Sequence, residues 1–171
     1  LYYEGDAPRS LLEFGREGCL AIHSLSKRSG MTGYRSGFLA GDPELVAKYG
    51  RYRASMGVAP QQFVQAAAEL AWTDTQHVAD RLGVFSAKRE VLMRMAKDRG
   101  LKVHGSQAGL YLWLEVPDGT TDLEYATKCR DVGIVVAPGS FFGKGQERFI
   151  RLALVPTVEE CRAAADAWPK A

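Results

Sequence analysis

The chain has 171 residues, of which 22 are Lys or Arg and 20 are Asp or Glu, so its formal net charge is +2. This near balance argues against binding to nucleic acid or to a membrane through bulk charge. Hydrophobic residues make up 46% of the chain and charged residues 25%, a composition typical of folded globular proteins that excludes wholesale disorder. No apolar run approaches the roughly 20 residues that a membrane-spanning helix needs.

The cysteines and the first residues indicate where the protein works. Cys19, Cys129 and Cys161 are odd in number, lie far apart and form no Cys-x-x-Cys pair. They predict reduced thiols and a cytoplasmic location. The first residues do not show the basic and then apolar pattern of a signal peptide. The chain begins without Met inside the apolar run Leu1-Tyr2-Tyr3, which we interpret as the interior of a longer protein.

The first 73 residues read as the end of an α/β domain. Residues 18–24 predict a short buried strand, a polar and glycine-punctuated loop follows over 25–33, and residues 34–40 predict a second buried strand. Pro43 suits the first turn of a helix that we expect to reach about residue 55. Apolar residues at helical spacing predict another helix over 62–72.

Residues 74–171 read as a small α+β domain, so we place the domain boundary between residues 73 and 74. A long helix is expected over 74–99, opened by a capping box of Thr73 and Gln76. Shorter elements follow, namely strands over 110–116, 134–137 and 149–155 and a helix over 122–132. Thr157 and Glu160 form a second capping box, which opens a last helix that ends near residue 168.

The most informative segment is the loop of residues 24–37, which combines hydroxyls with Lys27 and Arg35 between two strands. Loops at strand ends of α/β sheets are common ligand sites. A guanidinium and a serine hydroxyl suit a phosphate group. A lysine amine beside another cation in a dry site has a lowered pKa and can form a Schiff base with a carbonyl. Phosphate, aldehyde and lysine together point to pyridoxal phosphate.

This segment resembles the lysine motif of the fold-type-I pyridoxal-phosphate aminotransferases of class I/II, which reads Ser-x-x-Lys, seven residues and then Arg. Ser24, Lys27 and Arg35 match the three fixed positions. The resemblance implies that Lys27 bonds to the cofactor and moves a proton at the substrate α-carbon. It implies that Ser24 and Arg35 hold the cofactor phosphate.

The resemblance continues along the rest of the chain. Residues 109–114 resemble the family's glycine-aromatic strand, and residues 136–142 resemble its proline-glycine turn near the substrate. Residues 149–153 resemble the strand whose arginine binds the substrate α-carboxylate, which assigns this role to Arg151 with Arg148 as the local rival. The implied fold is α/β and comprises the C-terminal part of the family chain, with the end of the large α/β/α domain and the small α+β domain.

The activity implied by this resemblance is transfer of an amino group from glutamate to a keto acid by a homodimeric enzyme. The sequence around Lys27 is similar to that of succinyldiaminopimelate aminotransferases of lysine biosynthesis, so N-succinyl-2-amino-6-ketopimelate is a candidate substrate. A carbon–sulfur β-lyase of the same fold is an alternative. The family's Asp that pairs with the pyridine nitrogen precedes the stretch matched here. A second alternative is therefore an incomplete, non-catalytic fragment that needs a complementary N-terminal half.

Other motifs in the chain fit less well. Ser24 and Lys27 also match the Ser-x-x-Lys of penicillin-binding proteins, but the partner motifs Ser-Asp-Asn and Lys-Thr-Gly do not occur. The glycines over residues 139–145 depart from the P-loop in spacing and lack its Ser or Thr. His23, His77 and His104 are scattered without metal-ligand spacing, so we expect no metal site.

Overall fold

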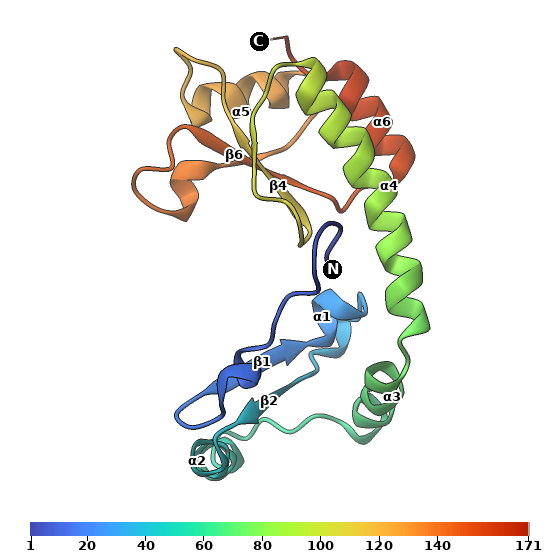
Figure 1. The fold of residues 1–171 in the computed structure, drawn as a ribbon, viewed down its shortest axis with the longest axis vertical. Helices are drawn as coiled ribbons and strands as arrows, with labels where there is room; N and C mark the ends of the chain where they lie inside the picture. The colour runs from blue at the N-terminus through green and yellow to red at the C-terminus, as the bar shows by residue number, and fades with distance from the viewer. Residues whose placement is uncertain (171) are drawn as a thin grey trace. The chain divides into compact units, whose positions relative to one another are not determined.

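The computed structural model describes residues 1–170, which divide into two compact units (Figure 1). One unit comprises Asp6–Arg81, and the other comprises Leu1–Gly5 together with the chain from Leu82 onward. The division after residue 81 falls inside a continuous helix, α4 (Gln76–Asp98), and not at the 73/74 boundary that the sequence suggests. His77, in the first turn of this helix, contacts the carboxylate of Asp74, which precedes the helix.

The unit Asp6–Arg81 contains a two-stranded antiparallel sheet, three α-helices besides the start of α4, and two short 3-10 helices, labelled η. Its strands β1 and β2 pair in register from Leu20↔Gly41 to Ser24↔Gly37. The elements in chain order are η1 (Leu11–Phe14), β1 (Leu20–Ser24), α1 (Leu25–Arg28), η2 (Thr32–Tyr34), β2 (Gly37–Gly41), α2 (Pro43–Ala54) and α3 (Gln62–Thr73). Pro43 occupies the first turn of α2, and the Asp42 carboxylate caps that helix by accepting from the amides of Glu44 and Leu45.

Two expectations for this unit were wrong. The stretch 25–33, expected to be a loop, begins with the helical turn α1, because the Ser24 hydroxyl caps it by accepting from the amide of Ser26 at 3.1 Å. The two strands, expected to be buried, contain no buried residue, and 76% of Ile22 is accessible. Within residues 1–170, β1 and β2 pair only with each other, so no further strand covers their edges.

The other unit is built on a four-stranded antiparallel sheet of order β3-β4-β6-β5. Its strands are β3 (Val103–His104), β4 (Tyr111–Glu115), β5 (Ala137–Pro138) and β6 (Phe149–Ala153). Its remaining elements are α5 (Asp122–Asp131), η3 (Gly139–Phe142) and α6 (Val158–Ala167). The expected strand over 134–137 is reduced to Ala137–Pro138, because only these residues pair with β6. Within this unit, α6 lies beside α4, and Arg99 donates to the carbonyl of Asp166 (Figure 1).

The core of this unit lies between the sheet and its helices. The alternate strand residues Leu112, Leu114 and Ile150 are fully buried, as period-2 patterning requires. The indole of Trp168 donates to the phenol oxygen of Tyr125 at 3.0 Å, so the polar groups of two large buried rings satisfy each other. Burial of Cys129 raises the pKa of its thiol to about 11, which leaves the thiol neutral and a poor nucleophile at neutral pH.

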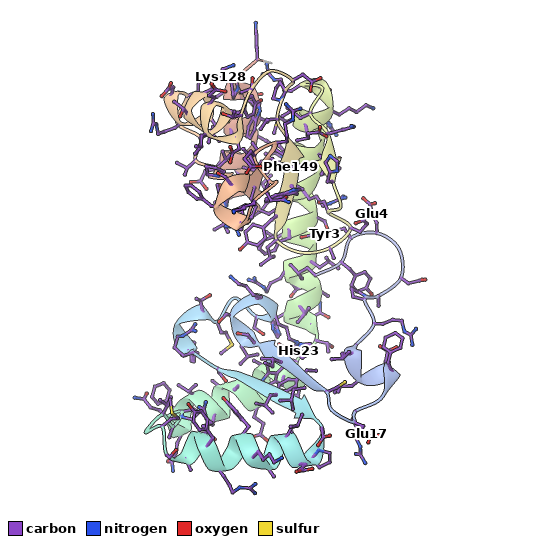
Figure 2. The ribbon with its side chains drawn as sticks, turned by 90° about the vertical axis from the view of Figure 1, so that its left-hand side faces the viewer. Tyr3, Glu4, Glu17, His23, Lys128 and Phe149 are labelled. Atoms are coloured by element: carbon purple, nitrogen blue, oxygen red, sulfur yellow. The ribbon has the colours of Figure 1, made fainter. Side chains whose placement is uncertain are left out.

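The N-terminal residues join this same unit. The amide of Tyr3 donates to the carbonyl of Gln107 at 2.7 Å, and the Tyr3 hydroxyl donates to the carbonyl of Gly109 at 2.6 Å. Arg89 of α4 donates to the carboxylate of Glu4 at 2.6 Å. In Figure 2, the labelled Tyr3 and Glu4 lie beside α4. Residues 1–5 thereby add a short extended segment at the start of β4.

The two expected capping boxes have different outcomes. At α6, the Thr157 hydroxyl accepts from the amide of Glu160 and the Glu160 carboxylate accepts from the amide of Thr157, so this box is confirmed. The box of Thr73 with Gln76 is wrong. Thr73 ends α3 and its hydroxyl donates back to carbonyls of that helix, while the carboxylate of Asp74 caps α4. Asp74 takes this role because its side chain accepts from the amide of Gln76 at 2.8 Å.

Residues 1–170 limit the possible kinds of site in two respects. No group of three His, Cys, Asp or Glu side chains is arranged to hold a metal ion in this part of the chain. None of the helices formed by these residues combines the length and the apolar character needed to cross a bilayer.

Candidate functional site

Lys27 lies on the short helix α1, directly after strand β1. The Ser24 hydroxyl caps this helix, and Lys27 is three positions after Ser24, within the same turn. Lys27 is exposed, and among residues 1–170 no hydrogen bond or ion pair engages its ammonium group. The dry environment expected around Lys27 is therefore not formed by these residues, but the amine is free to react.

Arg35 approaches α1 from the following loop. Its backbone is left-handed, with φ 49° and ψ 44°, which is uncommon for a residue other than glycine and frequent at functional sites. The guanidinium donates to the carbonyl of Thr32 at 2.9 Å and to the hydroxyl of Ser26 at 3.5 Å. Arg35 is thus held beside the first turn of the helix that carries Lys27.

The donors gathered at this turn fit a phosphate group. They comprise the hydroxyls of Ser24 and Ser26 and the guanidinium of Arg35, all within one network. Arginine binds phosphate oxygens through paired, charge-assisted hydrogen bonds, and the hydroxyls add single donors. The exposed, unpaired lysine nearby suits an aldehyde on the same ligand. The residues present therefore fit pyridoxal phosphate. Ser26 was not predicted as a site residue, although it lies between Ser24 and Lys27 in the sequence.

Arg35 also lines a cavity of about 570 Å³, whose lining does not include Ser24, Ser26 or Lys27. One wall is the loop Gly30–Arg35, and the other is formed by Arg53 and residues 58–64 at the start of α3. A cavity of this size can accommodate a small cofactor. The second guanidinium, from Arg53, adds positive charge to the same space, which favours an anionic ligand.

Arg151 lies in the other unit, on β6, between β4 and β5. It pairs with Trp113 on one side and Ala137 on the other. Its guanidinium stacks between two aromatic rings, 4.3 Å from the centroid of Tyr111 and 4.5 Å from that of Phe142. Among residues 1–170 it has no carboxylate partner. The rings hold the planar cation in place while its donors remain available to a carboxylate ligand.

The rival Arg148 is already occupied. It forms an ion pair with Asp118 at 2.7 Å, and a longer one with Glu115 at 3.6 Å. It also donates to the carbonyls of Val116 and Pro117. A guanidinium with this many partners has few donors left for a ligand. Of the two arginines, Arg151 therefore has more donors available to a ligand.

The turn that supplies Phe142 is held by a buried carboxylate. Asp122 is 1% exposed and accepts from the amide of Ser140 at 2.8 Å. Burial by itself would raise the pKa of Asp122, but hydrogen bonds from the Ser140 hydroxyl and amide outweigh it and hold the pKa below its usual value. Asp122 is therefore ionised at neutral pH and anchors the start of η3 against α5.

The structure brings Ser24, Lys27 and Arg35 together on and beside α1, whereas Arg151 belongs to the other compact unit. The aromatic neighbours of Arg151 were not identified as functional from the sequence. Tyr111 could have been found from the strand pairing, because residues diagonal to each other on neighbouring antiparallel strands share a face. Phe142 reaches Arg151 through a turn, which leaves no such periodic signal.

Comparison with known proteins places these features in a family. The sequence profile described as aminotransferase class I and II matches residues 2–167. The 4-dedimethylamino-4-oxo-anhydrotetracycline transaminase OxyQ of Streptomyces rimosus is 39% identical over 87% of this chain and 41% of its own length. An LL-diaminopimelate aminotransferase of Nitratidesulfovibrio vulgaris is 34% identical over 95% of this chain and 42% of its own.

Solved structures agree with this comparison. A probable N-succinyldiaminopimelate aminotransferase from Thermus thermophilus has a TM-score of 0.86 and 31% identity, covering 97% of this chain and 45% of its own. An aminotransferase from Neisseria meningitidis has the same TM-score and 37% identity, with the same coverage. The chain thus spans about two fifths of the length of the curated relatives it matches. Within that span, its sequence and fold show that the chain belongs to the class I and II aminotransferases.

Proposed function

We propose that this chain carries the lysine, the phosphate-binding and the carboxylate-binding residues of an aminotransferase that moves an amino group between glutamate and a keto acid. The family depends on pyridoxal phosphate. The proposal rests chiefly on one observation: Ser24, Ser26 and Arg35 surround a helical turn on which Lys27 has no partner within residues 1–170. Ser24 and Arg35 bind the cofactor phosphate, Lys27 bonds to its aldehyde and Arg151 binds the substrate α-carboxylate.

Each of these residues has a defined task. When bound, pyridoxal phosphate supplies an electron-withdrawing ring that stabilises negative charge on the substrate α-carbon. Lys27, once displaced by the incoming amine, is the base that takes the proton from that carbon and later returns one. Arg151 fixes the carboxylate through its two parallel donors and thereby orients the C–H bond that is broken. Ser24 and Arg35 hold the phosphate end, so that the reacting end stays within reach of Lys27.

The identity of the keto-acid substrate is also a proposal. The relatives are named for substrates as different as a tetracycline intermediate and LL-diaminopimelate. We propose N-succinyl-2-amino-6-ketopimelate, in keeping with the sequence around Lys27 and with the name of the Thermus thermophilus neighbour. A homodimer and a cytoplasmic location are likewise proposals, which rest on the family resemblance and on the three unpaired cysteines.

The test of this function is a single half-reaction. The chain is incubated with pyridoxal phosphate, desalted and mixed with glutamate. The same assay is run on a chimera that fuses the preceding part of the Nitratidesulfovibrio relative to this chain. We expect the chimera to form 2-oxoglutarate in an amount equal to its bound cofactor. In a parallel incubation with an S-alkyl cysteine, release of pyruvate, ammonia and a thiol, with no 2-oxoglutarate formed from glutamate, would indicate the β-lyase. Inactivity of a folded, cofactor-loaded chimera would indicate a non-catalytic fragment.

The role of Arg151 predicts a specific defect. Arg151→Gln removes the charged, bidentate guanidinium but keeps a polar side chain beside Tyr111 and Phe142. Because hydrogen bonds to charged groups contribute about 1.5–3 kcal/mol, we expect the KM for glutamate to rise roughly 10- to 100-fold. Arg148→Gln is the matched control, and its KM should stay near that of the unaltered chimera. Equal effects of the two substitutions would contradict the assignment.

A further inference from the structure

The two residues that follow Lys27 both reach the junction between α3 and α4, which comprises residues 71–77. Arg28 contacts the end of α3, and Ser29 contacts the start of α4. The turn that carries Lys27 is itself only four residues long, too short to be stable by its own hydrogen bonds. Its position therefore depends on such contacts with the rest of the unit.

The first anchor is the guanidinium of Arg28. It donates to the carbonyl of Ala71, to that of Asp74 at 3.2 Å and to that of Trp72 at 3.5 Å. It also lies 5.2 Å from the ring centroid of Trp72. The last carbonyls of a helix have no partners within that helix, and its dipole places partial negative charge there. Arg28 thus satisfies the end of α3 and binds the Lys27 turn to it.

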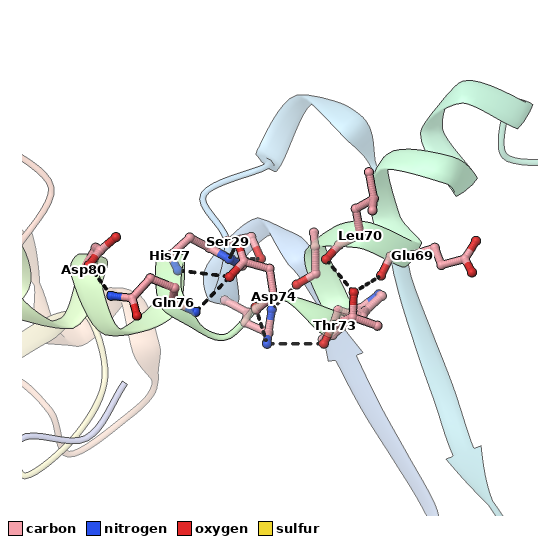
Figure 3. A network of polar contacts seen from close by, with 11 residues as sticks. Ser29, Glu69, Leu70, Thr73, Asp74, Gln76, His77 and Asp80 are labelled. Carbon is pink, nitrogen blue, oxygen red and sulfur yellow. Dashed lines mark hydrogen bonds and ion pairs between the residues drawn. The ribbon is translucent and has the colours of Figure 1, made fainter.

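The second anchor is a chain of side-chain hydrogen bonds from Ser29 through His77 to Asp74, shown in Figure 3. Nε2 of His77 lies 2.9 Å from the hydroxyl of Ser29, and Nδ1 lies 2.9 Å from the carboxylate of Asp74. The other carboxylate oxygen of Asp74 accepts from the amide of Gln76 and caps α4. The hydrogen bond from His77 is the main reason why the pKa of Asp74 lies below its usual value. The imidazole is therefore oriented by a charged acceptor on one side and meets the Ser29 hydroxyl on the other.

Serine, histidine and aspartate in this order also form the catalytic triad of hydrolases, but the surroundings differ here. A triad serine needs neighbouring amides that point towards a substrate oxygen. The amides of Ser29 and Met31 both donate to the carbonyl of Leu25 and so are committed to the end of α1. Half of the Asp74 side chain is exposed, whereas the triad aspartate is buried. The arrangement binds two segments together and does not activate the hydroxyl.

We propose that Arg28 and the Ser29–His77–Asp74 chain act as a tether that fixes the position of Lys27, with Arg28 and His77 as positioning residues. The tether acts through the backbone, because Lys27 is followed immediately by the two anchored residues. Its effect on the cofactor rests on the proposed function of Lys27. Its effect on the backbone of residues 25–31 does not depend on that function.

The test uses two readouts on the same variants of the full chain. Hydrogen–deuterium exchange of the peptide covering residues 25–31 reports how well the turn is held, through the amides of Ser29 and Met31. The visible absorbance of added pyridoxal phosphate bonded to lysine, titrated in the chain and in the chimera, reports the placement of Lys27. Ser29→Ala and His77→Phe break the second anchor, and Ser29→Thr and His77→Gln keep a group that can restore it.

The control variant comes from the same turn of α4. The side chain of Gln76 donates to Asp80 at 2.9 Å, a hydrogen bond that involves no residue of 25–31. Gln76→Ala therefore removes a side-chain hydrogen bond, in this case an exposed one, without removing any contact of the tether. Its exchange over residues 25–31 and its visible band should match those of the unaltered chain.

We expect Ser29→Ala and His77→Phe to speed exchange over residues 25–31 about three- to tenfold and to weaken apparent cofactor affinity by a similar factor, because each breaks one intramolecular hydrogen bond. Arg28→Met, which breaks three hydrogen bonds, should have the larger effect. Unchanged exchange would overturn the tether, and faster exchange with an unchanged band would overturn its role in positioning Lys27. A Lys27-dependent band missing from the unaltered chain and chimera would refute the proposed function, while exchange would still decide the tether.

Discussion

Replacing Lys27 with alanine is expected to abolish covalent attachment of pyridoxal phosphate to this protein. Lys27 is exposed, has no partner among residues 1–170 and lies on the turn that Ser24 caps and that Arg35 contacts through Ser26. Binding of the phosphate at those donors would hold the aldehyde at a high effective concentration near the amine. Borohydride reduction fixes the lysine–cofactor linkage, and mass spectrometry of the digested protein then locates it.

Other lysines provide the comparison in the same digest. Lys48 is also exposed, but it forms an ion pair with Glu44 at 2.7 Å, whereas Lys27 has no such partner among residues 1–170. Lys48→Ala should therefore leave the labelling of the Lys27 peptide unchanged. Labelling spread evenly over several lysines, or retained in Lys27→Ala, would show that Lys27 is not the cofactor lysine. A phosphate competitor such as inorganic phosphate should reduce labelling of Lys27 more than labelling of Lys48.

Replacing Gly139 with alanine is expected to produce the largest loss of stability among single-methyl additions to the unit that contains Arg151. A Cβ atom at this position would lie 2.1 Å from the carbonyl oxygen of Gln146 and 2.6 Å from that of Phe149. Both obstacles are backbone atoms, one in the turn before β6 and one in its first residue, so neither can move without shifting the start of the strand. Because overpacking a close-packed site costs about 1–3 kcal/mol and backbone obstacles yield least, we expect a loss of about 3 kcal/mol.

The effect of Gly139→Ala should reach the carboxylate-binding residue as well. Gly139 begins η3, whose last residue, Phe142, stacks on Arg151. Trp113 contacts Phe142 and Phe149 with ring centroids 5.5 and 5.6 Å away, so its fluorescence and near-ultraviolet circular dichroism report this region during denaturant unfolding.

The control substitution is Gly83→Ala, in α4 of the same unit. A Cβ atom there meets nothing within 4 Å, and the backbone is ordinary helix. Because alanine is favoured over glycine inside a helix, this variant should gain about 0.5–1 kcal/mol. A Gly139→Ala variant as stable as Gly83→Ala would show that the backbone at the start of β6 can shift without lowering the free energy of unfolding.

The local elements of this fold could be predicted from the sequence where their signals lie within a few residues. Helices α3 and α6 and the capping box of Thr157 follow from apolar periodicity and from a hydroxyl three residues before a glutamate. The spacing of Ser24 and Lys27 likewise needs only one helical turn. Such features depend on short-range geometry, which neighbouring residues specify by themselves.

Tertiary structure decided the features that join distant segments. Residues 25–28 became a helix and not a loop because Ser24 caps them and because Arg28 and Ser29 find partners 43 to 48 residues further along the chain. Asp74, and not Thr73, caps α4 because Thr73 is still within α3. Arg151 lies between Tyr111 and Phe142 only because β4, β6 and η3 come together. The motif around Lys27 was readable in the sequence because its residues are adjacent. The contacts that hold Lys27 and Arg151 in place are made by residues far apart in the chain, whose meeting depends on the packing of the whole unit.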